Sequence, residues 1–571
     1  MTDNIAPALS KNEHIKARSN LLRGGILEGL AVPQTGAIDE DDTQLTKFHG
    51  IYQQDDRDLR AERGRTRMEP AYSFMARLRI PGGQVTPAQY LALHEIARER
   101  GNGTIRLTTR ETVQFHGIIK GNLQPAIKAV SDAMLDTIAA CGDVNRNVMA
   151  TVNPHEGPAH AAALQLAHEI SDSLLPKSRA WHEIWVGGEQ LAGETQESEP
   201  MYGPTYLPRK FKIVVAVPPH NDVDIFAHDV GFVAHVKDGA IEGYDVTVGG
   251  GMGMTHGEQD TFPRTADWFA FVTPDQAIPT AAAILMAQRD HGNRAVRKNA
   301  RLKYTIERMG LEAFRSDVQA RLDFTLLPPR GATFTTTTDR TGWHEAGGLA
   351  HYGLWIENGR IDDTADRKLL TGLQAIARIH QGSFILTANQ NLLIAGVTNR
   401  PAIEALLAEH RLDAAQTPTR QAAMACVALP TCGLALAESE RYMPTLLTAI
   451  EAAMDQAGLA SEKIVIRMTG CPNGCARPYL AEIGLVGRGP GRYNLYLGAA
   501  ADGTRLNKLY RRDIGHDAIL AALTPLFQQY AIERIDGTSF GDWVIRAGHI
   551  QATTAGNRFH LDLNPALGEA A

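Results

Sequence analysis

The sequence predicts an α+β protein that contains an internal duplication. Two segments far apart in the chain each show a strand, a helix and then two short strands around a turn, and residues 105–117 align without a gap on residues 384–396. Four of the five cysteines also fall between residues 426 and 475, in a region of strands and helices of its own. A repeat at such long spacing favours two related halves over a solenoid, which repeats at short period.

The first copy begins with a predicted strand at residues 76–80, which the Pro-Gly-Gly of residues 81–83 ends. Thr86 and Pro87 are a helix N-cap and a first-turn proline, so we expect a helix from there to about Gly101. Residues 105–117 follow as two short strands around a turn. In the second copy residues 353–359 are again strand then turn, and residues 373–378 match residues 93–98. An alignment of residues 148–154 with residues 424–430 extends the repeat.

The two copies differ in the side chains on their strands. Alternate residues of a strand share a face. Copy one places arginines, Gln114 and His116 on such faces, and copy two has mostly apolar residues at the aligned positions. This difference predicts an anion-binding surface on copy one only. The polar positions of copy one are Arg77, Arg79, Arg106, Thr108, Arg110, Gln114 and His116, and the residues aligned with Arg106, Arg110, Gln114 and His116 are Ile385, Asn389, Leu393 and Ala395.

The remaining segments are less regular. Residues 1–70 are polar and carry a dense run of both charges, which indicates either a solvated arm or a segment packed on another domain or subunit. Lys210 and Lys212 share one face where a buried strand begins, as a gatekeeper pair or as part of an anion site with Arg146. Helical spacing puts Arg294, Arg297, Lys298 and Arg301 on one basic stripe, which an exposed helix face would also explain.

Two glycine-rich segments, residues 248–253 and 487–491, fit neither the dinucleotide nor the P-loop pattern, so we predict no nucleotide site. Beyond residue 418 we expect the cysteine region, strands at 483–486 and 493–497, a closing helix near 519–530 and a polar tail.

Composition narrows the class of protein. The 571 residues suggest two to four domains, and 44% hydrophobic with 21% charged residues is typical of a globular protein. The net charge of −7 argues against nucleic acid as a partner of the whole chain. The polar N-terminus lacks a secretory signal, and no apolar run could span a membrane, so we expect a reducing cytoplasm. Cys141 is then a reduced, partly buried thiol.

The four clustered cysteines have metal-ligand character. Cys426 and Cys432 are separated by five residues and Cys471 and Cys475 by three, and four thiolates suit a [4Fe–4S] cluster or a structural zinc. Both pairs stand where helices are expected to begin, and helix N-termini favour an anionic cluster. Zinc sites more often use two to four residues between both pairs. We therefore favour iron–sulfur, with zinc and two unrelated buried pairs as the alternatives.

The cysteine motif resembles that of the siroheme-dependent sulfite and nitrite reductases. Residues 48–58, 206–212 and 297–300 are further similar to the haemoprotein (beta) subunits of NADPH-dependent assimilatory sulfite reductases, and the resemblance covers nearly the whole chain. It implies a three-domain siroheme reductase fold with ferredoxin-like halves. The implied segments are an N-terminal arm (1–70), the paired halves (71–139 with 340–417), a siroheme- and substrate-binding domain (140–339) and an iron–sulfur domain (418–571).

The resemblance also implies two cofactors, a siroheme and a [4Fe–4S] cluster, coupled through Cys475 as the shared ligand. Siroheme carries eight carboxylates, so its pocket needs many cationic and amide donors. The implied cluster ligands are Cys426, Cys432, Cys471 and Cys475. The implied sulfite cradle is Arg77, Arg146, Lys210 and Lys212. The candidates for siroheme are Arg106, Arg110, Gln114, His116, Arg294, Arg297, Lys298 and Arg301.

The implied activity is the six-electron reduction of sulfite to sulfide in assimilatory sulfur metabolism and cysteine biosynthesis. Electrons would come from an NADPH-dependent flavoprotein (alpha) subunit in a hetero-oligomer, because the chain shows no nucleotide or flavin motif of its own. The alternatives are a siroheme nitrite reductase, a ferredoxin-coupled sulfite reductase and, from a different class, a zinc-stabilised binding protein without a redox role.

Overall fold

Two antiparallel sheets carry the duplicated halves in this computed structural model, which describes residues 8–178, 185–186, 189–190 and 199–560. One sheet has the order β1 (Ile51–Asp55), β2 (Tyr72–Arg77), β5 (Val113–Ile118), β4 (Ile105–Leu107) and β15 (Arg360–Ile361). The other has the order β13 (Gly342–Ala346), β14 (Leu349–Leu354), β17 (Leu392–Val397), β16 (Ser383–Leu386) and β3 (Gln84–Val85). Each copy thus lends one short strand, β3 or β15, to the sheet of the other.

The strand registers confirm the duplication. Arg106 pairs with Gln114 in copy one, and the aligned residues Ile385 and Leu393 pair in copy two. Gly117 and Gly396, which are aligned as well, both have left-handed backbone with φ of 73° and 71°. The first strand of copy one is predicted at residues 76–80, but β2 ends at Arg77 and Arg79 then bridges Asp136 outside this sheet. The strand in copy two, β14, likewise begins and ends earlier than predicted.

The helices of the two copies pack against one another. α5 (Pro87–Arg100) begins where the sequence predicts, because Thr86 accepts from the backbone N–H of Gln89 at 3.2 Å in a capping box. α5 packs on α11 (Leu369–Ile379), and each copy ends in a further helix, α6 (Lys120–Asp132) or α12 (Arg400–Glu409). Buried apolar residues from both copies form one continuous core.

The duplication extends to the rest of the chain. A third sheet has the order β6 (Met149–Ala150), β9 (Ile213–Ala216), β10 (Val230–Lys237), β11 (Ala240–Val248) and β12 (Asp267–Val272). A fourth repeats this topology with β18 (Met424–Ala425), β19 (Ile466–Thr469), β20 (Ile483–Gly489), β21 (Arg492–Leu497) and β22 (Lys508–Ile514). In both sheets the first three strands are parallel and the last two antiparallel.

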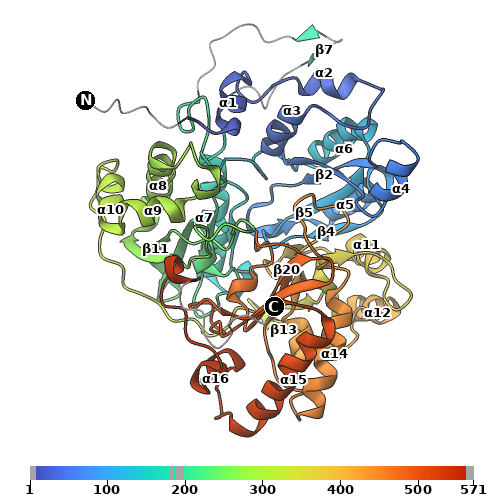
Figure 1. The fold of residues 1–571 in the computed structure, drawn as a ribbon, viewed down its shortest axis with the longest axis vertical. Coiled ribbons are helices and arrows are strands. Elements are labelled where there is room, and N and C mark those ends of the chain that lie inside the picture. Colours follow the sequence, from blue (N-terminus) through green and yellow to red (C-terminus); the bar gives the residue numbers. More distant parts are fainter. Residues whose placement is uncertain (1–7, 179–184, 187–188, 191–198, 561–571) are drawn as a thin grey trace.

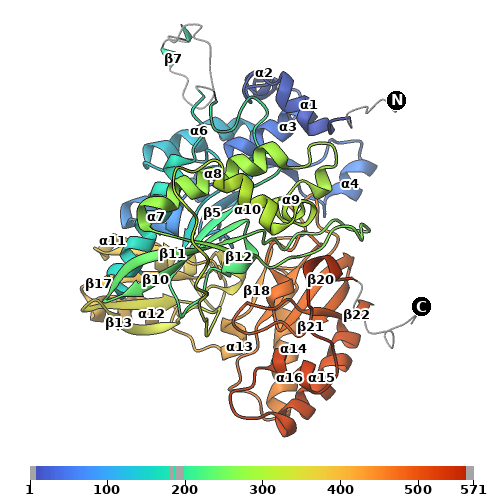
Figure 2. The same ribbon diagram turned by 90° about the vertical axis from the view of Figure 1, so that its left-hand side faces the viewer.

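The helices around these two sheets are equivalent too. α7 (Pro158–Ser173) and α14 (Met443–Gln456) lie between the first and second strands in sequence, and α8 (Ala277–His291) and α15 (His516–Glu533) follow the last strand. Figure 1 shows the four sheets grouped about the centre of the molecule, and Figure 2 separates the third sheet from the fourth, which α14 and α15 cover at the lower end. Segments from all four sheets therefore meet at the centre of the molecule.

The N-terminal segment is folded, so the solvated-arm expectation is wrong and the packing alternative is correct. Residues 11–65 form α1 (Lys11–Arg18), α2 (Ile26–Ala31), α3 (Glu40–Leu45), β1 and α4 (Arg60–Arg65). Buried Lys16 donates to the carbonyl of Leu207 at 2.8 Å, which ties α1 to the middle of the chain. Residues 1–7, part of the polar N-terminus, lie outside the described residues.

Two further expectations need correction. The basic run 294–301 is a loop with a 3-10 turn at Arg297–Asn299, and helices resume only with α9 (Leu302–Met309) and α10 (Leu311–Gln319). The closing helix is confirmed as α15. The expected polar tail instead contains a further helix, α16 (Phe540–Arg546), whose Trp543 is fully buried. Residues 561–571 lie outside the described part. Within the residues that the structure describes, every helix is too short or too polar to traverse a lipid bilayer.

Candidate functional site

The four clustered cysteines lie at the ends of two neighbouring strands. β18 and β19 are parallel, so the loops that leave their carboxyl ends start side by side. Cys426 follows β18 directly, and its N–H donates to the carbonyl of Met468 at 3.2 Å. The expected helix starts at the cysteine pairs are wrong: after Cys432 the chain forms turns until α14, and after Cys471 it forms a 3-10 turn at Pro478–Leu480.

The thiols influence one another without meeting at one point. Burial raises the pKa of Cys426 well above its usual value, and the nearby Cys475, Cys471 and Cys432 raise it further. Burial and Cys475 likewise raise the pKa of Cys471 to about 12. Among the described residues, no three His, Cys, Asp or Glu side chains converge closely enough for a single metal ion. A tetrahedral zinc takes four sulfurs around one centre, whereas an iron–sulfur cluster takes one thiolate per iron.

Backbone and side-chain donors surround the sulfurs. The N–H of Gly470 donates to Cys426 Sγ at 3.3 Å, and Asn473 Nδ2 lies 3.6 Å from Cys471 Sγ. Arg57, from the N-terminal segment, donates to the carbonyls of Cys432 and Ala435 at 3.2 and 2.6 Å. Donors of this kind stabilise anionic cluster sulfur and fix the ligand loops.

The glycine-rich segment 248–253 packs on the second cysteine loop. The N–H of Met254 donates to the carbonyl of Pro472 at 2.9 Å. A Cβ at Gly474, whose φ is 63°, would lie 2.9 Å from the carbonyl oxygen of Met252. These glycines therefore allow two backbones to approach closely, which accounts for the motif without a nucleotide.

Lys210 and Lys212 are half-buried cations without a partner among the described residues. They flank Phe211, which bridges Asn145 in parallel fashion and so brings Arg146 alongside. Neither ammonium has a hydrogen bond or ion pair with any residue that the structure describes. Burial lowers the pKa of both lysines well below the usual value, and neighbouring cations, Arg209 first for Lys210 and Arg110 first for Lys212, lower it further. Half-buried ammonium groups that have no opposite charge beside them favour the binding of an anion at this site.

Arg77 and Arg146 complete the cationic group. Gln114, the strand neighbour of Arg77, accepts from Arg77 Nε at 3.0 Å when its amide oxygen faces the guanidinium. Arg77 Nη1 also donates to Cys141 Sγ at 3.1 Å. Burial lowers the pKa of Arg77, but Cys141, Tyr52 and Cys475 raise it above the usual value overall. Arg146 is held by the carbonyl of Gly142 through Nε and Nη2 at 3.2 and 3.1 Å.

Several buried polar groups near these cations have no partner among the described residues. Both ring nitrogens of His116 are unpaired, and burial lowers its pKa well below the usual value. Arg110 donates to the carbonyl of Ile213 at 3.3 Å, yet its Nε is free. Arg106 contacts Glu440 at 3.1 Å and leaves Nη1 free, and Arg301 contacts Asp229 at 2.7 Å and leaves Nε free. Buried orphan donors in such number fit a polycarboxylate group.

The other three members of the predicted basic stripe have acidic partners in the protein. Arg294 contacts Glu13 at 2.5 Å, Arg297 binds Asp143 through both Nη atoms at 2.7 and 2.9 Å, and Lys298 contacts Glu258 at 2.6 Å on the surface. The stripe fails because Asn293 caps a turn there, accepting from the N–H groups of residues 295 and 296.

Sequence reasoning missed several residues of the site. Arg209 is half-buried without a hydrogen-bond or ion-pair partner among the described residues, and loss of solvation and the nearby Arg297 lower its pKa to about 10. Its position beside Lys210 was the available signal. The side chain of Tyr52 hydrogen-bonds Cys141, and burial raises its pKa. No local pattern marks Tyr52, because its neighbours come from distant segments.

Arg477, also missed, joins the cysteine loop to both copies of the duplication. Its Nη1 donates to the carbonyl of Thr109 at 3.0 Å and its Nη2 to that of Ala388 at 2.9 Å, and these two residues occupy aligned positions. Its Nε binds Asp224, the residue at the matching left-handed position after β9. Arg477 therefore sits between the related halves, two residues after Cys475.

Comparison with known proteins agrees with this architecture. The family model described as the nitrite/sulfite reductase ferredoxin-like half domain matches residues 67–133 and again 344–410. The model described as the nitrite and sulphite reductase 4Fe-4S domain matches residues 167–326. That segment holds no cysteine; the clustered cysteines lie in its structural repeat.

The chain belongs to the nitrite and sulfite reductase family. A protein of Methylobacterium nodulans, 59% identical over 97% of this chain and 93% of its own length, is named sulfite reductase [NADPH] hemoprotein beta-component. A protein of Chromohalobacter salexigens with the same name is 55% identical over 97% of both chains. Among solved structures, Mycobacterium tuberculosis NirA covers 95% of this chain and 97% of its own with a TM-score of 0.77 at 24% identity, which is a likeness of fold.

Proposed function

We propose that this chain reduces sulfite to sulfide with six electrons, as the haemoprotein component of an assimilatory sulfite reductase. The observation that carries the proposal is the group of Arg77, Arg146, Lys210 and Lys212 beside Cys475, with both ammonium groups unpaired. A small oxyanion would satisfy these cations. The names of relatives that are 55% to 59% identical support sulfite as that anion.

The chain binds a siroheme and a [4Fe–4S] cluster. Cys426, Cys432, Cys471 and Cys475 would hold the cluster, with Cys475 shared between the two groups. Among the expected siroheme residues, those with orphaned polar atoms fit the macrocycle's carboxylates best: Arg106, Arg110, His116 and Arg301. When bound, the two groups would supply electrons one at a time to the anion.

The protein's own residues bind the anion and move protons. Arg77 and Arg146 stay protonated and hold the oxyanion in place, since a guanidinium gives up its proton too reluctantly to serve as an acid. Lys210 and Lys212 have lowered pKa values, so their ammonium groups release protons more readily to an oxygen that leaves as water. Four cations around a half-buried site also lower the cost of adding negative charge to the substrate.

Electrons reach this chain from a partner in the proposal. The glycine-rich segment 248–253 packs on the second cysteine loop, so it is not assigned to a nucleotide. The relatives are named beta-components, which supports a partner subunit. We therefore assign an NADPH-dependent flavoprotein alpha subunit as donor, in a hetero-oligomer in the cytoplasm. The same proposal divides the chain at residues 70, 139, 339 and 417. The sheets support that division, except that β1 joins the sheet of the first copy.

The test compares substrates and donors on the purified protein. With a reduced viologen as donor, we expect kcat/KM for sulfite to exceed that for nitrite. A large preference for nitrite would assign the site to nitrite reduction instead. Turnover with a flavoprotein reductase and NADPH, compared with turnover with ferredoxin, decides the donor. Iron and acid-labile sulfide counts, with a visible spectrum, check both cofactors; a colourless protein that holds only zinc would refute the proposal.

A further inference from the structure

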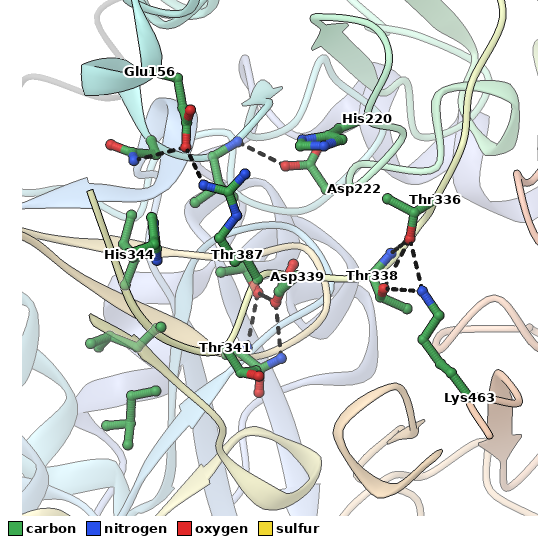
Figure 3. A pocket seen from close by; sticks show the side chains of 18 residues that line it. Glu156, His220, Asp222, Thr336, Thr338, Asp339, Thr341, His344, Thr387 and Lys463 are labelled. Atoms are coloured by element: carbon green, nitrogen blue, oxygen red, sulfur yellow. Dashed lines mark hydrogen bonds and ion pairs between the residues drawn. The ribbon is translucent and has the colours of Figure 1, made fainter. Parts of the chain in front are cut away.

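A second cavity occupies the place in copy two that the cationic site occupies in copy one. It has a volume of about 240 Å³ and lies between β17 and the loop of residues 218–222 (Figure 3). That loop follows β9 and precedes β10, as the loop of Cys471 to Cys475 follows β19 and precedes β20. The strand pairs Val214–Gly231 and Arg467–Gly484 are equivalent, and they align the loops without a gap. Asp222 then takes the place of Cys475.

Asp222 presents an unused acceptor to this cavity. Its side chain lines the cavity and the residue is only 6% exposed. Oδ2 accepts from the N–H of Val152 at 2.9 Å, whereas Oδ1 has no hydrogen-bond partner among the described residues. Burial and the nearby Asp339 raise the pKa of Asp222 to about 7. A cationic donor at the unpaired oxygen would stabilise the charged form, so the site favours such a ligand.

Lys463 supplies the opposite charge at the mouth. Figure 3 shows its ammonium reaching Thr336 and Thr338, whose hydroxyls lie 3.3 and 3.2 Å away. It forms no ion pair with any residue that the structure describes. The other charged groups of the lining are already satisfied: Arg340 contacts Glu156 at 3.2 Å, and Asp339 accepts from Thr387 and Asn391 at 2.6 and 2.9 Å.

The remaining wall is mixed: it includes His220 and His344, whose pKa values burial lowers, and an aliphatic part. Leu354, Leu392 and Leu393 line the aliphatic part, and Leu393 stands where copy one has Gln114. The cavity therefore offers the acceptor of Asp222, the ammonium of Lys463, two imidazoles whose pKa values are lowered, and an aliphatic surface. An anion alone would leave Asp222 unpaired, and a cation alone would leave Lys463 unpaired. A polycarboxylate macrocycle would find too few unpaired cations in a volume of about 240 Å³.

We propose that this cavity binds a small zwitterion of the α-amino-acid class. The ammonium group donates to Asp222 Oδ1, the carboxylate lies against Lys463, and a small aliphatic side chain contacts the leucines. The inference concerns a different site from the reductase centre and stands whether or not the proposed function does.

Calorimetric titration of the purified holoenzyme tests the proposal. The probes are L-alanine and L-valine, with acetate and methylamine as controls that carry one charge each. We expect the amino acids to bind about tenfold or more tightly than either control, since each charged hydrogen bond adds roughly 1.5–3 kcal/mol. The proposal is overturned if neither amino acid gives binding heat at concentrations up to about 10 mM. A Kd of that size corresponds to a binding free energy of only roughly 3 kcal/mol. Acetate that binds as well as alanine would overturn the proposal too, since the site would then be for an anion only.

Two variants locate the binding. Asp222→Asn keeps an oxygen for Val152 and removes the charge, and Lys463→Met removes the exposed ammonium; each is expected to weaken amino-acid binding about tenfold. Lys237→Met, on the exposed end of β10, is the matched control and leaves binding unchanged. Binding that survives both cavity substitutions would place the amino acid elsewhere and refute the assignment.

Discussion

The two ferredoxin-like halves share a backbone and present opposite chemistry. Arg106 and Gln114 of copy one pair in the same register as Ile385 and Leu393 of copy two. Copy one faces the cysteine loop with cations and orphaned donors, whereas copy two faces a small cavity with leucines. The loops opposite them differ in the same sense, with Cys475 on one side and Asp222 on the other. The comparison teaches that duplication produced the same backbone geometry twice, whereas the side chains of the two sites diverged.

The largest effect is expected from substitution of Cys475, the predicted cofactor ligand that aligns with Asp222 in the other half. Cys475→Ser is expected to abolish turnover and the coupled absorbance of the two cofactors, because the shared thiolate is lost. The measurement is a visible spectrum with iron and acid-labile sulfide counts. Asp222→Asn, at the matching position of the other half, is the control and is expected to keep the full iron content. Intact cofactor absorbance in Cys475→Ser would show that another group bridges the two cofactors.

The next test removes Lys212, the proposed proton donor. Lys212→Ala is expected to retain both cofactors and lose about 100-fold in turnover, the usual scale for a positioned acid. Steady-state kinetics with sulfite and a reduced viologen measure it. Lys237→Ala, an exposed lysine of β10, should match the unsubstituted enzyme. Full turnover in Lys212→Ala would remove this lysine from the mechanism.

A third test converts one position of copy one to the residue of copy two. Gln114→Leu removes the acceptor that holds Arg77, and we expect kcat/KM for sulfite to fall about tenfold. Gln114→Glu keeps an acceptor at the same place and should restore most of the activity. If both variants behave alike, contact with Arg77 is not what this position contributes.

The smallest effect expected is on the pH dependence of anion affinity. Burial and neighbouring cations lower the pKa of Lys210 and Lys212, so each loses its charge at lower pH than an ordinary lysine. Sulfite binding needs the charged form, so its affinity should fall as pH rises through these lowered values. Titration by absorbance across the alkaline range measures it, and Lys210→Met should flatten the profile. Affinity that rises with pH would contradict the assignment.

Much of the fold could be predicted because it depends on local patterns. Alternating strands, the Thr86 cap and the ungapped repeat are confirmed in the strand registers. The repeat of β6 and β9 to β12 in the cysteine region was visible only as a short match at residues 148–154, since packing constrains side-chain size and leaves residue identity free. The helical basic stripe predicted at residues 294–301 was wrong, because the same spacing of basic residues occurs in a loop. Asn293 begins this loop by accepting from the N–H of Ala295.

The sequence alone predicted the duplication and the quartet of clustered cysteines, because a repeated segment and a local concentration of a rare residue type are visible without the fold. The assignment of the cationic cradle came from the family resemblance and stays a prediction. Only the tertiary structure decided which cations remain free. Arg294, Arg297 and Lys298 look equal to Arg301 in sequence, yet they meet Glu13, Asp143 and Glu258, residues from distant parts of the chain. A charge becomes available to a ligand only when folding brings no opposite charge to it, and that depends on long-range contacts.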